Sequence, residues 1–144
     1  MIEHIVHQDR TLAIILRTGF RKDGIEFFTP PEFSQQLAYM KRCQGYAIPP
    51  HVHNPVPREV RFTHEVLLIK SGRVRVDFYQ HGDAYLESRV LGPGDVILLC
   101  DGGHGFVMLE ESEIIEVKQG PYAGEDDKRR FEPVDEACVR LEDC

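Results

Sequence analysis

The sequence lacks any long apolar run. The longest stretches, residues 12–16 and 96–100, are far shorter than the roughly 20 residues that a helix needs to cross a bilayer. The first ten residues, MIEHIVHQDR, also lack the basic start and apolar middle of a secretory signal peptide. We therefore expect a protein of the cytoplasm with no membrane partner.

Positive charge is also scarce. Seventeen Lys and Arg residues face 24 Asp and Glu residues, which gives a formal net charge of −7. Such a balance argues against binding to nucleic acid or to an anionic membrane surface.

The chain has no Trp, and its four cysteines form no CxxC pair. In a reducing compartment we expect all four to be free thiols; they are Cys43, Cys100, Cys138 and Cys144.

What the chain does contain is a series of short β-prone runs. With 144 residues it has about the length of one domain, and 12 Gly and 9 Pro supply turns between the runs. The runs cover residues 11–20, 25–29, 36–48, 65–70, 73–79, 85–91, 96–99, 106–109 and 114–118. Eight to ten such strands, with turns every 8–12 residues, predict an all-β antiparallel barrel or two-sheet sandwich.

Two hairpins are predicted within this series. A Lys-Asp-Gly turn separates residues 11–20 from 25–29, and a Ser-Gly turn separates 65–70 from 73–79. Residues 33–42 could alternatively form a short helix. In the run RVRVDFY the apolar residues alternate with Arg and Asp, which is the period of a half-buried strand. We assign residues 1–122 to one β-barrel domain with an N-terminal strand extension, and 123–144 to a charged tail or short helix.

Two histidines give the sharpest local signal. His51 and His53 are two residues apart, so on a strand both side chains point to the same face and can reach one metal ion. Glu65 then opens a predicted strand that ends at Gly72, and His104 follows a later strand and turn.

These residues resemble the two-part motif of the cupin superfamily. Its first part reads Gly, five residues, HxH, a short gap, Glu, six residues, Gly. In this chain the matching residues are Gly45, His51, His53, Glu65 and Gly72. The gap from HxH to Glu holds eleven residues, where three or four are usual.

The second part of the cupin motif reads Gly, five residues, Pro-x-Gly, two residues, His. Gly94 and Gly102 match it, Cys100 replaces the usual Pro, and His104 comes one residue early. The resemblance covers about residues 45–118. The closing run IEVKQGPY, with Asp127-Lys128 after it, also looks like the end of small cupin metalloproteins from bacterial surface-polysaccharide pathways.

The resemblance implies a cupin-type antiparallel β-barrel (a jelly roll) with one divalent metal ion held by His51, His53, Glu65 and His104. Three imidazoles and one carboxylate suit Fe, Mn, Ni or Zn. Four protein ligands would fill a tetrahedral zinc site, whereas an octahedral ion would keep two positions for a chelating substrate.

The function expected from this site is a metal-dependent enzyme, of the isomerase or epimerase type, that acts on a small polar substrate such as a sugar or nucleotide sugar. Three alternatives remain open. The first is an iron-dependent dioxygenase, and the second is a non-catalytic cupin that binds a small ligand. The third is a metal-free isomerase that uses histidine as acid and base.

Several further residues have a functional and a structural interpretation. Arg58 and Arg61 lie in the insert after HxH, beside the expected barrel mouth, where they could bind a carboxylate or phosphate or be ordinary surface charge. His64 should face away from Glu65, and His81 should be solvated in a turn.

The remaining expectations concern a cysteine, the last predicted strand and the oligomeric state. Cys100 is expected to be a buried filler. In the last predicted strand Ile115 and Val117 are expected to face the core, which would turn Glu116 and Lys118 to solvent. We also expect a homodimer, because the N-terminal strands leave apolar edge surface to cover.

Overall fold

The computed structural model describes residues 1–142, with the side chains of all except 125 and 126. Within that range the protein is all-β, as the sequence predicts, and its regular helices are two short 3₁₀ turns. The strands are β1 (Ile2–His7), β2 (Arg10–Leu16), β3 (Gly24–Phe27), β4 (Ala38–Lys41), β5 (Glu65–Ser71), β6 (Val74–Tyr79), β7 (Tyr85–Leu91), β8 (Val96–Leu99), β9 (Gly103–Met108) and β10 (Glu113–Lys118).

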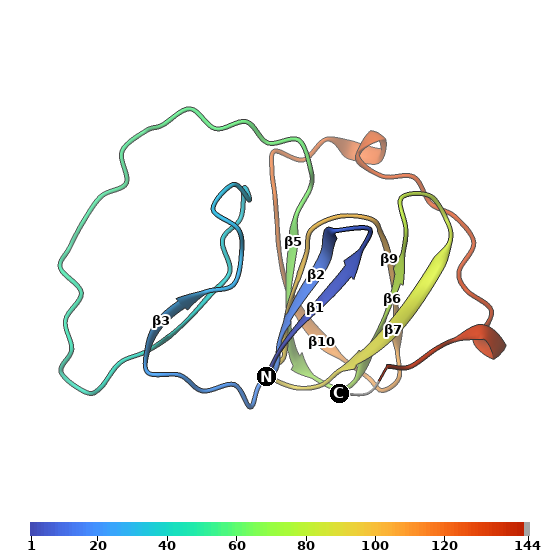
Figure 1. Ribbon diagram of the computed structural model, residues 1–144, viewed down its shortest axis with the longest axis horizontal. Coiled ribbons are helices and arrows are strands. Elements are labelled where there is room, and N and C mark those ends of the chain that lie inside the picture. Colours follow the sequence, from blue (N-terminus) through green and yellow to red (C-terminus); the bar gives the residue numbers. More distant parts are fainter. Residues whose placement is uncertain (143–144) are drawn as a thin grey trace.

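The strands form three antiparallel sheets (Figure 1). One sheet has the order β1-β2-β8-β5-β10, a second the order β7-β6-β9, and a hairpin of β3 and β4 is the third. The described strands do not close into a barrel. The closed barrel, one of the two arrangements that the strand pattern allowed, is therefore not observed, and the larger groups of strands form two separate sheets.

One hydrophobic core lies between the two large sheets. It takes buried side chains from β1, β2, β5 and β8 of the first sheet and from β6 and β7 of the second. Val74, Val76 and Phe78 are at most 1% exposed, so the apolar face of β6 points inward, as its alternating pattern predicts. Burial of such side chains contributes roughly 1.5–3 kcal/mol each.

The opposite face of β6 is buried too, which the half-buried pattern did not predict. Arg75 and Asp77 are 5% and 2% exposed. The Arg75 Nε donates to Asp77 Oδ1 at 2.8 Å, and the guanidinium also pairs with Glu136. Charged side chains are buried here because the C-terminal part of the chain covers them.

We name this covering segment, residues 123–142, the C-terminal strap. It contains the 3₁₀ helices η1 (Gly124–Asp127) and η2 (Glu136–Cys138), where the sequence left a charged tail or a short helix open. The Val134 N–H donates to the Tyr79 hydroxyl at 3.0 Å, and the Ser88 N–H donates to the Arg140 carbonyl at 2.8 Å. The strap is thus fastened to both β6 and β7, outside the second sheet (Figure 1).

Both predicted hairpins are wrong. β5 and β6 are consecutive but belong to different sheets, and the chain crosses between them at Gly72. Gly72 has φ +80°, and a Cβ there would lie 2.3 Å from the Glu111 carbonyl oxygen, so glycine is required. β2 pairs with β1 and β8, because its run of buried residues on both faces needs a central place in a sheet.

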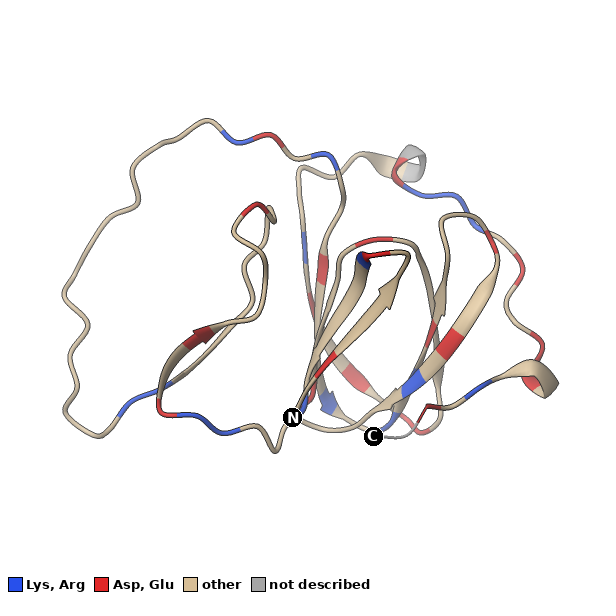
Figure 2. Ribbon diagram, viewed as in Figure 1, with Lys and Arg blue, Asp and Glu red and all other residues tan. Residues whose placement is uncertain are grey.

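A long segment after β4 extends away from the sheets (Figure 1). The strand predicted over residues 36–48 ends at Lys41, and every residue from 40 to 63 is exposed. We name residues 42–63 the exposed arm. Its stretch from 43 to 57 carries no Lys, Arg, Asp or Glu (Figure 2). Its exposed apolar residues are Tyr46, Ile48, Val52, Val56, Val60 and Phe62. No helix among residues 1–142 is long and apolar enough to cross a membrane.

Candidate functional site

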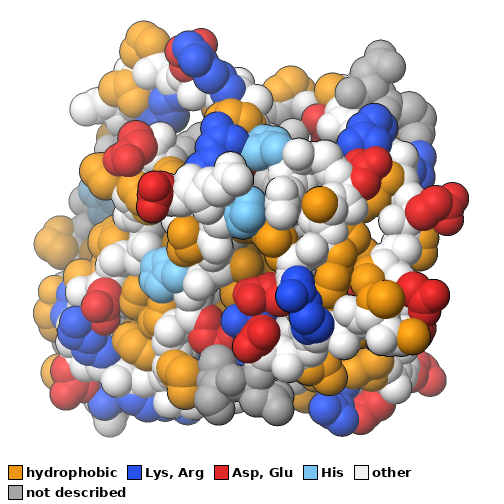
Figure 3. Space-filling view, turned by 45° about the vertical axis from the view of Figure 1, so that its right-hand side comes forward, with side chains coloured by type: hydrophobic (Ala, Val, Ile, Leu, Met, Phe, Trp, Pro, Cys, Tyr) orange, Lys and Arg blue, Asp and Glu red, His pale blue; other side chains and the backbone are white. Residues whose placement is uncertain are grey.

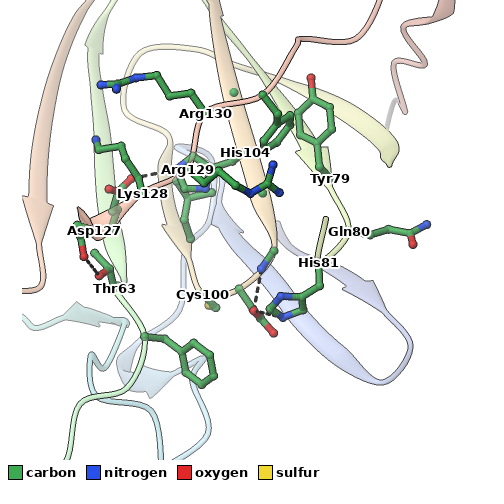
Figure 4. A pocket seen from close by; sticks show the side chains of 18 of the residues that line it. Thr63, Tyr79, Gln80, His81, Cys100, His104, Asp127, Lys128, Arg129 and Arg130 are labelled. Carbon is green, nitrogen blue, oxygen red and sulfur yellow. Dashed lines mark hydrogen bonds and ion pairs between the residues drawn. The ribbon is translucent and has the colours of Figure 1, made fainter. Parts of the chain in front are cut away.

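A pocket with a volume of about 890 Å³ lies where the two large sheets and the C-terminal strap meet (Figure 4). Its walls include the start of β5, the end of β10, β9 and the turn after β6. Charged and polar side chains line it together with apolar ones, among them Phe62, Leu99 and Phe106. Such a mixed lining suits a small ligand that has both polar groups and a carbon skeleton.

Glu65 and His104 both line this pocket and contact each other. Glu65 is the first residue of β5 in the five-stranded sheet, and His104 is the second residue of β9 in the three-stranded sheet. The Nε2 atom of His104 lies 3.1 Å from Oε2 of Glu65. The side chains are 28% and 14% exposed, so the pair is shielded but open to the pocket. Two residues from the two halves of the sequence motif therefore meet.

Lys118 completes a three-membered charge cluster. It lies directly opposite Glu65 in the pairing of β10 with β5, and its Nζ is 2.7 Å from Glu65 Oε1. The hydrogen bond from His104, together with that from Lys118, lowers the pKa of Glu65 to about 2. Glu65 is therefore a carboxylate at neutral pH, and the same contact raises the pKa of Lys118.

The pocket wall also contains a second contact between a histidine and a carboxylate. His81 Nε2 lies 2.5 Å from Asp101 Oδ1, and the side chain is solvated, as the sequence predicts. The side chain is 53% exposed, so His81 is both accessible and held by a carboxylate. Tyr79 is almost buried beside it, and burial raises the pKa of its hydroxyl.

The other two predicted metal ligands lie elsewhere. His51 and His53 belong to the exposed arm and not to a strand, and neither lines the pocket. Their rings contact each other, with centroids 5.3 Å apart, and His51 Nδ1 lies 3.0 Å from the Pro49 carbonyl oxygen. Among the described residues no group of three or more His, Cys, Asp or Glu side chains could hold a metal ion. The four residues thus form two separate pairs.

The two predicted substrate-binding arginines also separate. Arg61 lines the pocket, while Arg58 does not. The Arg61 Nε donates to Glu59 Oε1 at 3.0 Å, and both side chains are 73% exposed. His64 is buried outside the pocket lining, where its ring packs near Phe33 and burial lowers its pKa.

Sequence reasoning missed several pocket residues. It expected Ile115 and Val117 to face the core, but these are 51% and 58% exposed. Glu116 and Lys118 line the pocket instead. These side-chain directions are set by the register of β10 against β5, which shifts between Glu113 and Ile114. No local sequence pattern reveals this shift.

The C-terminal strap supplies a further group that the sequence did not single out. Lys128, Arg129 and Arg130 all line the pocket (Figure 4). Arg129 pairs with Asp83 at 2.6 Å, and Phe131 packs on Tyr79 with ring centroids 5.0 Å apart. A run of three adjacent cations in a chain of net charge −7 is the signal that could have identified them.

One face of the protein has a mixed surface. Figure 3 shows a face on which charged side chains of both signs alternate with hydrophobic ones and histidines.

The chain as a whole was compared with known proteins in three ways. A scan against family models, a search of curated proteins and a search of solved structures each found no match.

Proposed function

We propose that the protein is a cupin-type enzyme of the isomerase or epimerase class, and that it acts on a small polar substrate in the pocket around Glu65 and His104. The substrate class is a sugar or nucleotide sugar. One observation carries the proposal: the glutamate and the histidine of the two motif halves, 39 residues apart, are in contact in the lining of one pocket.

The contact between these residues suits acid–base chemistry. When the Nε2–H of His104 donates to the Glu65 carboxylate, Nδ1 becomes the nitrogen that can take a proton from a substrate. Because Glu65 stays ionised, it stabilises the imidazolium that forms. Isomerisation and epimerisation next to a carbonyl need such a proton transfer, and a positioned histidine typically contributes about 10²–10⁴-fold.

Lys118 adds a positive charge to the same site. Its ammonium is held by Glu65 and by Glu116, 2.7 and 3.0 Å away. Removing a proton beside a carbonyl leaves negative charge on the substrate oxygen, and a fixed cation in the pocket stabilises that charge. The three side chains together provide a base, a group that orients it and an electrostatic partner for the intermediate.

A second candidate function is the metal-dependent enzyme that the sequence resemblance implies. Its donor set of His51, His53, Glu65 and His104 would suit Fe, Mn, Ni or Zn, and the two arm histidines lie beside each other, with ring centroids 5.3 Å apart. A bound ion would polarise a substrate carbonyl. The described arrangement keeps the arm histidines apart from the pocket pair, so it does not fit a four-ligand site and the steps above use no metal.

The proposal is tested by deuterium incorporation. Sugar phosphates and nucleotide sugars are first screened by thermal shift, and each compound that binds is then followed by proton NMR in D2O. We expect exchange of a carbon-bound proton that falls about 10²–10⁴-fold in His104→Gln, with the compound still bound. His4→Gln, which removes an exposed imidazole on β1, is the matched control.

Two outcomes contradict the proposal. Equal exchange rates in the parent and in His104→Gln would exclude this histidine as the base. Binding without exchange in any compound would favour the alternative of a non-catalytic ligand-binding cupin.

A further inference from the structure

The C-terminal strap contributes an unusual concentration of positive charge to the pocket. Lys128, Arg129 and Arg130 are consecutive, and all three line the cavity. Arg61 and Lys118, which belong to other parts of the chain, line the same cavity. This gathering occurs in a protein whose formal net charge is −7, so average composition does not account for it.

The acidic residues of the pocket already have partners. Glu65 and Glu116 both contact Lys118, and Asp101 contacts His81. Asp127 accepts a hydrogen bond from the Thr63 hydroxyl at 3.0 Å (Figure 4). Three of these carboxylates thus have a Lys or His partner outside the strap, while Asp127 is hydrogen-bonded to a neutral hydroxyl.

Two of the strap cations differ in how they are held. The Arg129 guanidinium is fixed by Asp83 and lies 5.5 Å from the centroid of the Phe131 ring. The Lys128 ammonium has no ion-pair or hydrogen-bond partner among residues 1–142 whose side chains are described. A fixed guanidinium beside an unpaired ammonium is a suitable arrangement for an anion with several oxygens.

We propose that Lys128, Arg129 and Arg130, together with Arg61 of the same pocket lining, form a subsite for a phosphate or diphosphate group of the substrate. The inference rests on the proposed function, because it assigns the anionic end of a ligand whose reacting part lies at Glu65 and His104. It narrows the substrate class to phosphorylated or nucleotide-linked compounds. It also gives the strap a role in binding in addition to covering β6.

The test uses inorganic pyrophosphate, with binding to the full chain measured by isothermal titration calorimetry. We expect pyrophosphate to bind the parent protein, and to bind Lys128→Ala/Arg130→Ala at least about tenfold more weakly. The affinity of the parent should fall as salt is raised, since the contacts are exposed charges. If the double variant unfolds, Lys128→Ala alone is measured, because this exposed side chain has no described partner to lose.

The matched control is Lys70→Ala/Arg73→Ala. It also removes two positive charges, one Lys and one Arg. These side chains are 58% and 56% exposed and do not line the pocket. Unchanged pyrophosphate affinity in this control is expected. Equal weakening in the control and the strap variant, or no binding by the parent, would overturn the subsite.

Failure of the subsite can be separated from failure of the proposed function. His104→Gln should retain pyrophosphate binding while it loses proton exchange in a bound sugar. If exchange depends on His104 but pyrophosphate does not bind, only the subsite is wrong. If pyrophosphate binding depends on Lys128 but exchange is indifferent to His104, the subsite stands and the acid–base assignment is wrong.

Discussion

Arg75 and Glu136, 61 residues apart in the sequence, form a bidentate ion pair. The Nη1 and Nη2 atoms of Arg75 lie 2.6 and 2.7 Å from the two carboxylate oxygens of Glu136. The same guanidinium binds Asp77 on its own strand. This pair links the outer face of β6 to the C-terminal strap, and the strap in turn supplies a wall of the pocket.

Removing Arg75 should cost much more stability than removing Glu136. Arg75→Ala leaves the buried Asp77 carboxylate without its cation, a change expected to cost about 3–5 kcal/mol. Glu136 has a side chain 71% exposed, so solvent screens its ion pair and Glu136→Ala should cost much less. Urea unfolding of both variants measures the difference. Equal losses would show that Asp77 does not depend on Arg75.

The ion pair also predicts a pH dependence. Arg75 lowers the pKa of Glu136, so the pair stabilises the fold above the ordinary glutamate pKa, and this contribution is lost as pH falls through the lowered value. The free energy of unfolding of the parent should therefore exceed that of Glu136→Gln at pH 7, and the two should converge at low pH. A gap that persists at pH 2 would contradict this linkage.

Cys100 should be the least reactive of the described thiols. It is 4% exposed, as its expected filler role implies, and burial raises its pKa to about 12. Cys43 and Cys138 are free and exposed, whereas Cys144 lies outside the described residues. At pH 8 we expect alkylation of Cys100 to be at least about a hundredfold slower, because little thiolate is present. Peptide mass spectrometry after timed iodoacetamide treatment measures the rates, and similar rates for all three would exclude a buried Cys100.

Metal analysis tests the second candidate function. If a divalent ion is held by His51, His53, Glu65 and His104, the purified protein should contain one equivalent, and His51→Ala/His53→Ala should lose it. The variant should remain folded, since both histidines are exposed. His4→Ala provides the control, and elemental analysis gives the stoichiometry. Full retention of metal by the double variant would rule out these ligands.

The expected homodimer is tested by light scattering. The exposed arm carries apolar side chains that a second copy could cover, among them Ile48, Val52 and Phe62. We expect a particle of twice 16.5 kDa at micromolar concentration. Val52→Ser/Phe62→Ser should shift it toward the monomer without loss of stability. A parent protein that measures 16.5 kDa would dispose of the dimer.

The strand pattern predicted much of the fold because burial alternates locally. Residues 85–91 and 96–99 are strands at the predicted bounds, and Val74, Val76 and Phe78 face the core. The pairing of strands was not predictable in the same way. Whether β5 pairs with β6 or crosses to another sheet depends on contacts such as that of Gly72 with Glu111, which are distant in sequence.

The candidate site was predictable only in part. The spacing of the motif identified Glu65 and His104, which the structure brings together. Lys118 was missed because its position depends on the register of β10 against β5. The strap residues were missed because the Arg75–Glu136 contact that fixes them joins distant parts of the chain.

The exposed arm has a consequence for the integrity of the chain. It is the connection between β4 and β5, and the strands before it include β2, which lies between β1 and β8 in the five-stranded sheet. A protease that cuts within residues 42–63 would therefore sever the polypeptide without removing any strand from the core. The two fragments would stay associated through the β2–β8 pairing and the side chains of Leu12, Ala13 and Ile15. The same property makes the arm a place where new chain ends could be introduced, with the two pieces produced separately and then mixed.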